Sequence, residues 1–226
     1  MPEVIETTVY TFEELDERSK ERARDWYRQA WAQDDWYEFV FDDFERICEL
    51  LGVVLATRPV RLFGGGTRTK PCIWFSGFSS QGDGACFEGS YSYRKGASRA
   101  IRTYAPRDMR LAAIADQLQQ IQRRNLYALE ARVTHRGRYY HEHSMEISVE
   151  RNSDRDQLPT ADAEEGVSEA LRDLARWLYR QLEQEYDHQM SNKLVDEGII
   201  ANGYTFTEPR KRTQNWIKLC ANVSRA

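Results

Sequence analysis

A glycine-rich turn with two carboxylates is the first stretch whose residues could do chemistry. Gln81-Gly82-Asp83-Gly84 lies between two aromatic-rich segments, and Glu88 follows on the return segment. Backbone amides exposed at glycines, together with carboxylates, could hold a metal ion or a polar ligand. Asp-Gly and Gln-Gly are also ordinary hairpin-turn pairs, and the glycine spacing is not G-x-G-x-x-G. The turn therefore predicts a contact loop at Gln81 and Asp83 in preference to a phosphate site.

Two histidines and two cysteines form a second candidate group. His141 and His143 share one face of a predicted strand, and with Cys72 and Cys86 they could supply the four ligands of a zinc ion. No C-x-x-C pair fixes their spacing, and both cysteines also fit as small core residues. We therefore predict neither a metal site nor a cofactor.

An acidic series follows helical spacing. The acidic residues recur at steps of three and four and are Asp35, Glu38, Asp42, Glu45 and Glu49. Such a stripe can bind a basic protein surface or imitate the phosphates of nucleic acid, although a solvated helix face is the simpler interpretation. We predict these five residues, together with Gln81 and Asp83, as partner-binding residues.

A basic series supplies the alternative. Arg94, Lys95, Arg99 and Arg102 open an arginine-rich stretch that reaches residue 124, with tyrosines close by in the sequence. Phosphate contacts and base stacking would make this stretch a nucleic-acid-binding surface. No helix-turn-helix, zinc-finger or RNA-recognition signature accompanies it.

The charges are segregated along the chain. Residues 1–60 hold 15 acidic and 7 basic residues, whereas residues 61–140 hold 5 acidic and 14 basic residues. This asymmetry indicates either an anionic partner for the middle segment or pairing of the two segments within the fold.

Motifs of catalysis do not appear in the sequence. We find no nucleophile elbow, no H-E-x-x-H and no P-loop, so the sequence favours a protein that is not an enzyme. A small-ligand or metal-dependent enzyme at the glycine-rich hairpin remains a second alternative.

The elements that must position these residues follow from periodicity and turn residues. We predict two hairpins, at 72–93 and 126–150, which supply an antiparallel sheet. Further strands are predicted at 3–10 and 53–63, and helices at 12–31, 34–51, 94–104, 108–124, 162–188 and 191–201. The prediction is a single α+β domain over 1–206 with helices packed on the sheet, followed by a segment, 207–226, that is helical from 213 to 223.

The second hairpin allows a register prediction. A three-residue loop, His135-Arg136-Gly137, would pair Val133 with Tyr139, Ala131 with His141 and Leu129 with His143. That register keeps the apolar faces together and places Gly137 at the left-handed position of the loop.

Composition sets the class of protein. The chain has 226 residues, a net charge of −4 and four scattered cysteines, which is typical of a cytosolic protein with reduced thiols. No apolar run approaches the ~20 residues of a membrane span, and the N-terminus lacks the order of a signal peptide. We predict a cytoplasmic protein that does not contact a membrane.

Three stretches resemble a known family. They are Tyr10–Leu15 with Lys20–Tyr27, Phe75–Gly89 and His135–His141, and the likeness extends over most of the chain to about Phe206. They resemble small proteins of bacteriophages, prophages and other mobile elements, some labelled "antitoxin of toxin–antitoxin stability system". The resemblance implies a genetic setting and assigns no functional residue.

The resemblance and the charge pattern together suggest a function. Accessory phage proteins of this size commonly bind a host factor, and inhibition of a defence system such as CRISPR interference is one such role. We therefore expect a cytoplasmic protein that binds and inhibits a host protein or nucleoprotein complex, with a nucleic-acid-binding regulator as the alternative.

Overall fold

The computed structural model describes residues 8–31, 35–62, 64–152 and 158–207. The helices are α1 (Glu17–Trp31), α2 (Glu38–Leu51), α3 (Ala97–Tyr104), α4 (Met109–Arg124), the 3-10 helix η1 (Glu142–Ser144), α5 (Ala163–Gln189) and α6 (Asn192–Ala201). The strands are β1 (Val9–Thr11), β2 (Val53–Leu55), β3 (Thr57–Arg61), β4 (Thr67–Pro71), β5 (Ile73–Phe75), β6 (Ala85–Phe87), β7 (Gly89–Ser92), β8 (Leu129–His135), β9 (Met145–Arg151) and β10 (Thr205–Thr207).

Contacts within the chain divide it into two compact units. One unit combines residues 1–36 with 184–226, and the other is residues 37–183. All strand pairs of the described residues are antiparallel, which confirms the predicted α+β class with antiparallel sheets. The prediction of one domain over 1–206 stays a prediction.

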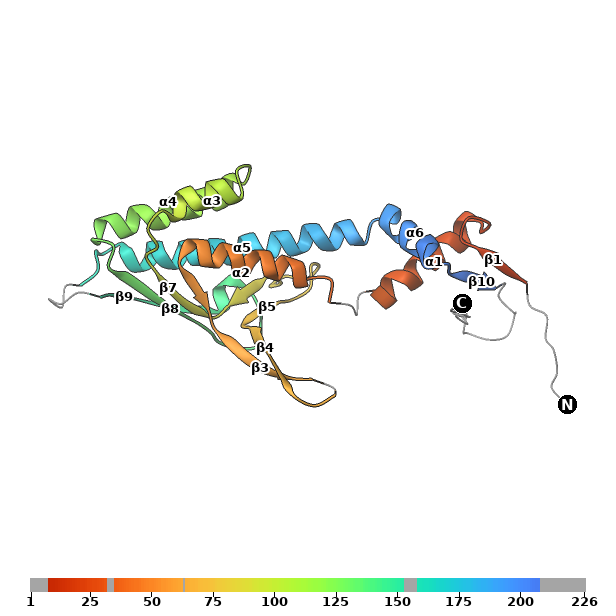
Figure 1. Ribbon diagram of the computed structural model, residues 1–226, viewed down its shortest axis with the longest axis horizontal. Helices are drawn as coiled ribbons and strands as arrows, with labels where there is room; N and C mark the ends of the chain where they lie inside the picture. The colour runs from red at the N-terminus through yellow and green to blue at the C-terminus, as the bar shows by residue number, and fades with distance from the viewer. Residues whose placement is uncertain (1–7, 32–34, 63, 153–157, 208–226) are drawn as a thin grey trace. The chain divides into compact units, whose positions relative to one another are not determined.

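The first unit has its own small core. Strands β1 and β10 pair, and helices α1 and α6 pack together (Figure 1). Its buried residues are Phe12, Ala23, Val195 and Ile199, and the rings of Tyr27, Tyr204 and Phe206 pack against them. Both ends of the described chain therefore fold into one hydrophobic cluster.

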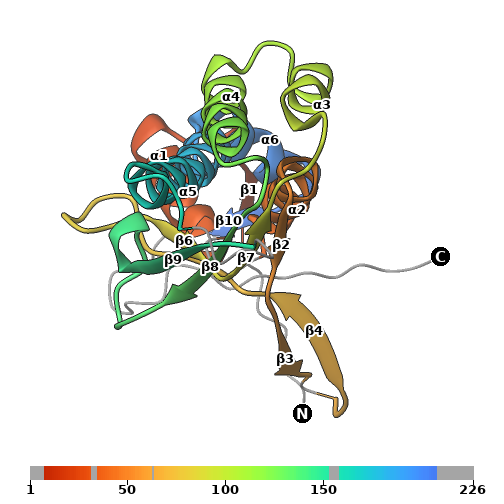
Figure 2. The same ribbon diagram turned by 90° about the vertical axis from the view of Figure 1, so that its left-hand side faces the viewer.

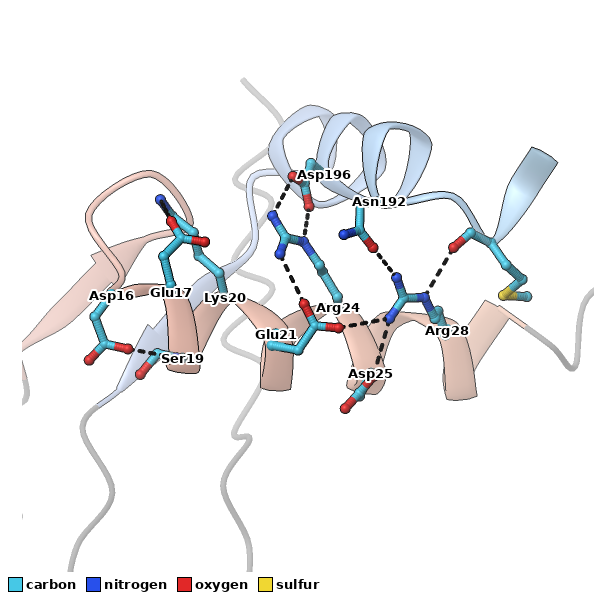
Figure 3. A network of polar contacts seen from close by, with 11 residues as sticks. Asp16, Glu17, Ser19, Lys20, Glu21, Arg24, Asp25, Arg28, Asn192 and Asp196 are labelled. Carbon is cyan, nitrogen blue, oxygen red and sulfur yellow. Dashed lines mark hydrogen bonds and ion pairs between the residues drawn. The ribbon is translucent and has the colours of Figure 1, made fainter. Parts of the chain in front are cut away.

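A polar network joins the two helices of this unit (Figure 3). The Arg24 guanidinium donates from Nε to Asp196 Oδ1 at 2.7 Å and from Nη2 to Asp196 Oδ2 at 2.8 Å. Glu21 accepts from Arg24 and from Arg28, and Arg28 donates to the carbonyl of Met190. Forked arginine–carboxylate pairing of this kind fixes orientation as well as distance, so it sets how α1 lies on α6.

Helix α1 begins later than predicted. The expected start at residue 12 is wrong, because Glu14 Oε2 accepts from the backbone N–H of Thr11 at 2.7 Å and from its hydroxyl. These bonds close a turn in place of a helical one. The helix begins after Asp16, whose Oδ1 accepts from the Ser19 N–H at 2.7 Å and caps the first turn.

The second unit is built on a four-stranded sheet of order β2-β7-β8-β9. Helices α2 and α5 lie on one face of this sheet, and α3 and α4 form a further layer beyond them (Figure 2). The core between sheet and helices contains Phe44 and Phe87, whose ring centroids lie 5.6 Å apart, and the fully buried Leu174 and Leu178 of α5. The opposite face of the sheet carries Ser90, Arg132 and Ser148 in one exposed row.

Three residues connect three strand pairs of the second unit through backbone hydrogen bonds. Ala56 N donates to Glu88 O at 2.8 Å, Glu88 N donates to Cys72 O at 2.9 Å, and Cys72 N donates to Ala56 O at 2.7 Å. The bonds form a closed cycle in which each residue donates once and accepts once. From this junction the pairs β2–β7, β3–β4 and β5–β6 diverge. The predicted hairpin at 72–93 therefore divides at Glu88 between two sheets.

The β3–β4 pair forms an arm that projects away from the four-stranded sheet (Figure 2). Pro59 lies opposite Thr69 within the arm, and each strand has only the other as a partner among the described residues. A proline is tolerated here because the arm consists of edge strands. Gly65 and Gly66 adopt positive φ angles at its tip.

The register of the β8–β9 hairpin differs from the prediction. Val133 pairs with Ile147 and Ala131 with Val149, so the predicted partners Tyr139 and His141 are wrong. The connection is longer because His141 to Ser144 form a 3-10 turn, in which His141 Nδ1 accepts from the His143 N–H at 3.0 Å. Odd-numbered residues still face odd-numbered residues, so the apolar face itself is as predicted.

Three sequence predictions concern chain ends and helix starts. Helix α2 begins at Glu38, not at residue 34, and Asp34 lies outside the described residues. Only residues 9–11 of the predicted strand at 3–10 form β1, since residues 1–7 are not among those described. The predicted helix at 213–223 and Cys220 also lie outside them.

Candidate functional site

An open groove of about 480 Å³ separates α2 from the β3–β4 arm. Acidic residues of α2 form one wall, the basic face of the arm forms the other, and aromatic rings lie at its base. The lining includes Glu38, Asp42 and Glu45 on the first wall, Arg58, Arg68 and Lys70 on the second, and Tyr37, Phe41, Trp74 and Phe75 at the base. The groove lies wholly within the second unit.

Glu38 bridges the two walls of the groove. Its Oε1 lies 3.4 Å from Lys70 Nζ and 3.8 Å from an Arg68 guanidinium nitrogen. The side chains of Glu38 and Arg68 are 44% and 59% exposed, so these pairs add little to stability and can open at small cost. The acidic and basic segments of the sequence therefore do meet in the fold, at this one residue of the groove.

Asp42 and Glu45 are the unmatched charges of the acidic wall. Neither forms an ion pair with a described residue, whereas the neighbouring Glu38 and Glu49 each have a basic partner. Burial raises the pKa of the Glu45 carboxyl, and the nearby Asp42 and Glu49 carboxylates raise it further. A cation placed beside Asp42 and Glu45 would relieve this repulsion, so the wall is suited to a basic ligand.

The base of the groove is aromatic. The rings of Tyr37, Phe41 and Phe75 lie 5.0 to 6.1 Å from one another. Trp74 already faces a cation, because the Arg58 guanidinium carbon lies 5.4 Å from its ring centroid. Aromatic faces attract ammonium and guanidinium groups, particularly where carboxylates stand beside them. Next to the acidic wall of α2, the combination of rings and carboxylates favours a cationic side chain over an anionic one.

The structure separates the seven predicted partner-binding residues. Glu38, Asp42 and Glu45 line the groove, while Glu49 lies on α2 outside the lining and pairs with Arg46 at 2.7 Å. Asp35 precedes α2 and belongs to the other unit, so the prediction that all five acids form one helical stripe is wrong. The reason is the later start of the helix at Glu38.

The glycine-rich turn holds itself together through Asp83. The Asp83 carboxylate accepts from the N–H groups of Ser79 and Ser80, at 3.0 and 2.7 Å. Gln81 is exposed at the tip. Gly84 is buried, and a Cβ added there would lie 2.5 Å from the Cβ of His141. The carboxylate of Asp83 therefore organises the loop, and the need for glycine at 84 is a close approach of two backbones.

The predicted nucleic-acid-binding residues are partly engaged within the fold. Arg94 donates to the carbonyl of Glu49 at the C-terminal end of α2, and Arg102 forms a forked pair with Asp116. Lys95 and Arg99 are exposed. Two of the four cations are thus committed to intramolecular contacts, which weakens this surface as a phosphate-binding site.

The histidines and cysteines do not form a metal site in the described part of the chain, where no three His, Cys, Asp or Glu side chains converge. Cys48, Cys72 and Cys86 are buried free thiols, and burial raises the pKa of Cys86 to about 12. A thiol with so high a pKa is protonated at neutral pH and is a poor nucleophile and ligand.

Sequence reasoning missed the basic and aromatic sides of the groove. Arg58, Arg68 and Lys70 alternate with other residues on two short strands, and this alternation places them on one face of the arm. This alternation is visible in the sequence and could have predicted the basic wall. The aromatic base could not be predicted in this way, because Tyr37 and Phe41 have the spacing that is also expected of core residues in a helix.

Comparisons with known proteins give one match. The model of a family described as a domain of unknown function, DUF8835, matches residues 36–192. No curated protein and no solved structure matches the chain. In the part of the chain that the structure describes, no helix combines the length and apolar character needed to cross a membrane.

Proposed function

The chain belongs to this family of unknown function, and we propose that it is a binding protein whose groove between α2 and the β3–β4 arm receives a basic segment of a partner protein. The observation that supports the proposal most directly is the pair Asp42 and Glu45. These carboxylates line an open groove with an aromatic base and have no cationic partner among the described residues. A lysine or arginine of the partner would supply one.

The proposed biological role rests on the sequence resemblance. The resemblance to phage and mobile-element proteins supports a partner in the host, either a protein or a nucleoprotein complex, and supports an inhibitory role of anti-defence or antitoxin type. The proposed role needs no chemical step. Inhibition results if the groove occupies a basic segment that the partner needs for its own function.

Electrostatics gives the proposal a physical basis. Complementary charge raises the rate of encounter and selects against acidic partners, while the aromatic base supplies buried contact area. The exposed pair of Glu38 with Arg68 and the half-buried, 3.4 Å pair of Glu38 with Lys70 can open to admit the segment, because ion pairs near the surface are weak.

A peptide-binding experiment tests the proposal. The probe is a fluorescent peptide of alternating lysine and valine, with the same peptide carrying glutamate for lysine as the comparison. We expect the lysine peptide to bind, and we expect D42R/E45R to weaken that binding by about tenfold or more.

A matched variant controls for net charge. E164R/E165R makes the same change in charge at two exposed residues of α5 outside the groove lining and should leave the affinity unchanged. Equal weakening in both variants, or equal binding of both peptides, would show that the groove is not the site.

The same variants separate the proposal from its alternative. A nucleic-acid-binding regulator should bind single-stranded or duplex DNA with a steep dependence on salt, and R99E should then weaken binding while D42R/E45R should not. Under the proposal, D42R/E45R should weaken binding of the lysine peptide and R99E should not. Because Arg94 and Arg102 are engaged within the fold, this alternative rests on Lys95, Arg99 and the exposed Arg107, Arg110 and Arg123 of the same basic stretch.

A further inference from the structure

Backbone hydrogen bonds at the two ends of the β3–β4 arm show which residues of β3 and β4 are bonded to each other. Leu62 N donates to Gly66 O at the tip, and Cys72 N donates to Ala56 O at the base. Both pairs continue the register of the arm, in which Arg58 faces Lys70. Hydrogen-bonded pairs alternate with non-hydrogen-bonded pairs in an antiparallel ladder. The even-numbered residues of β3 and β4 are therefore bonded within the arm, and the odd-numbered residues turn their N–H and C=O groups outward.

The two outer edges of the arm differ in where each carries a proline: β3 has Pro59 at its centre, whereas β4 has Pro71 as its last residue, next to the junction. On β3 the central outward residue is Pro59, which has no N–H to donate. On β4 the corresponding residue is Thr69, which has both an N–H and a carbonyl. Proline on an edge strand is a common device against pairing with another chain. The β3 edge is thus protected at its centre, whereas β4 is open at Thr69 and Thr67.

The open edge lies beside the groove. Four consecutive residues of β4, 68 to 71, line the groove, whereas β3 contributes only Arg58 and Val60 from its even-numbered face. The outward groups of Thr69 therefore open where the acidic wall of α2 begins. An isolated two-stranded ribbon is marginally stable, and a third strand would stabilise it.

We propose that the partner segment binds as an extended strand that pairs with the outer edge of β4. This inference rests on the proposed function and specifies its geometry. The backbone of the segment exchanges hydrogen bonds with Thr69 and Thr67, as in strand addition to an exposed sheet edge. Alternate side chains of the segment face α2, and a lysine or arginine in that row lies beside Asp42 and Glu45. The weak pairs of Glu38 with Arg68 and Lys70 open as the segment enters.

Backbone methylation of the probe separates strand pairing from attraction by charge. The first probe is the alternating lysine–valine peptide, and the second is the same peptide with alternate backbone nitrogens methylated, which keeps the charge and removes donors. We expect the methylated peptide to bind at least about tenfold more weakly.

Proline substitution tests the edge itself. T69P removes the central donor of the β4 edge at a position where the opposite residue, Pro59, is already proline. T57P removes an outward donor from β3 and is the matched control. We expect T69P to weaken the unmethylated peptide by about five- to tenfold and T57P to leave it unchanged. Urea unfolding of both variants, and T69V, which keeps the N–H, show whether the arm is intact.

The outcomes are distinguishable. Equal affinity for both peptides, or equal affinity in T69P and T57P, overturns strand pairing. The proposed function still stands in that case if D42R/E45R weakens binding of the unmethylated peptide. Failure of the unmethylated peptide to bind wild-type protein overturns the proposed function, and strand pairing with it.

Discussion

At the scale of single residues, Glu45 is the carboxylate of the groove whose charge is least balanced by its described neighbours. It is half-buried on α2, has like charges beside it and has no cation from the described residues as a partner. Burial and the like charges of Asp42 and Glu49 both disfavour the ionised form of this carboxyl. A basic ligand would turn the unfavourable charge into a favourable one.

The raised pKa of Glu45 has a definite consequence for stability. The folded state binds the Glu45 proton more tightly than the unfolded chain, so the stability that this group contributes falls as pH rises through the raised pKa. We expect E45Q to be more stable than wild type at neutral pH and equal to it below the usual value of 4.5. Urea unfolding at both pH values measures this.

A variant at an exposed glutamate provides the control for that comparison. E164Q should show no such dependence on pH, because Glu164 lies exposed on α5. A loss of stability in E45Q at neutral pH would mean that the Glu45 carboxylate makes a favourable contact in the free protein.

Gly84 tests the packing that underlies the glycine-rich turn. Its N–H donates to Ser76 Oγ at 3.0 Å, and an added Cβ would lie 2.8 Å from the Cα of His141. Because a backbone atom cannot move aside as a side chain can, we expect G84A to cost roughly 1–3 kcal/mol in the free energy of unfolding. G64A is the control, since nothing lies within 4 Å of its added Cβ. Equal stability of the two variants would refute this close approach.

At the scale of elements, the sequence predicted most helices and the strand faces. Helix α4 and helix α6 agree with prediction to within a residue, because Asp108 and Ser191 are capping residues followed by apolar periodicity. The β8–β9 register failed because His141 caps a 3-10 turn through its ring nitrogen, and no turn residue signals that. Glu14 likewise closes a turn that resembles a capping box.

The groove itself was only half predictable. Its acidic wall comes from helical spacing within one segment, which sequence shows directly. The opposite wall comes from the arm, whose direction depends on the cyclic bonds of Ala56, Cys72 and Glu88. These residues are far apart in the sequence and bond through their backbones, so their side chains carry no signal of the junction.

The arm should show alternating protection of its amides. Arg68 and Lys70 donate within the arm, whereas Thr67 and Thr69 point outward in the phase fixed by its ends. Hydrogen exchange should therefore be slower at Arg68 and Lys70 than at Thr67 and Thr69. Slower exchange at Thr67 and Thr69 would mean that their N–H groups are bonded within the arm, which would contradict strand addition at Thr69.

The forked pair in the first unit has an expected cost. R24A removes both bonds to Asp196, whose carboxylate is 27% exposed, and we expect a loss of roughly 1.5–3 kcal/mol in the stability of that unit. R24K should rescue little, because an ammonium cannot form the fork. Hydrogen exchange at Ala23, Val195 and Ile199 reports this locally. K20A, which removes a single ion pair to the exposed Glu17, is the control. An equal loss of stability in K20A would show that the forked pair has no special role.

At the scale of the whole molecule, the family range and the groove coincide. The matched residues, 36–192, contain all of the second unit and therefore every residue that lines the groove. Most of the first unit lies outside that range and carries its own core and polar network. A function shared by the family would accordingly be located in the second unit, where the unmatched carboxylates lie.

One measurement tests the central claim most directly. Amide chemical shifts of the full chain are recorded while the alternating lysine–valine peptide is added. We expect saturable shift changes over residues 37–45 and 67–75, absent when the D42R/E45R variant is titrated. Shift changes confined to residues 94–102, or changes that persist in the variant, would contradict the assignment of the groove as the binding site.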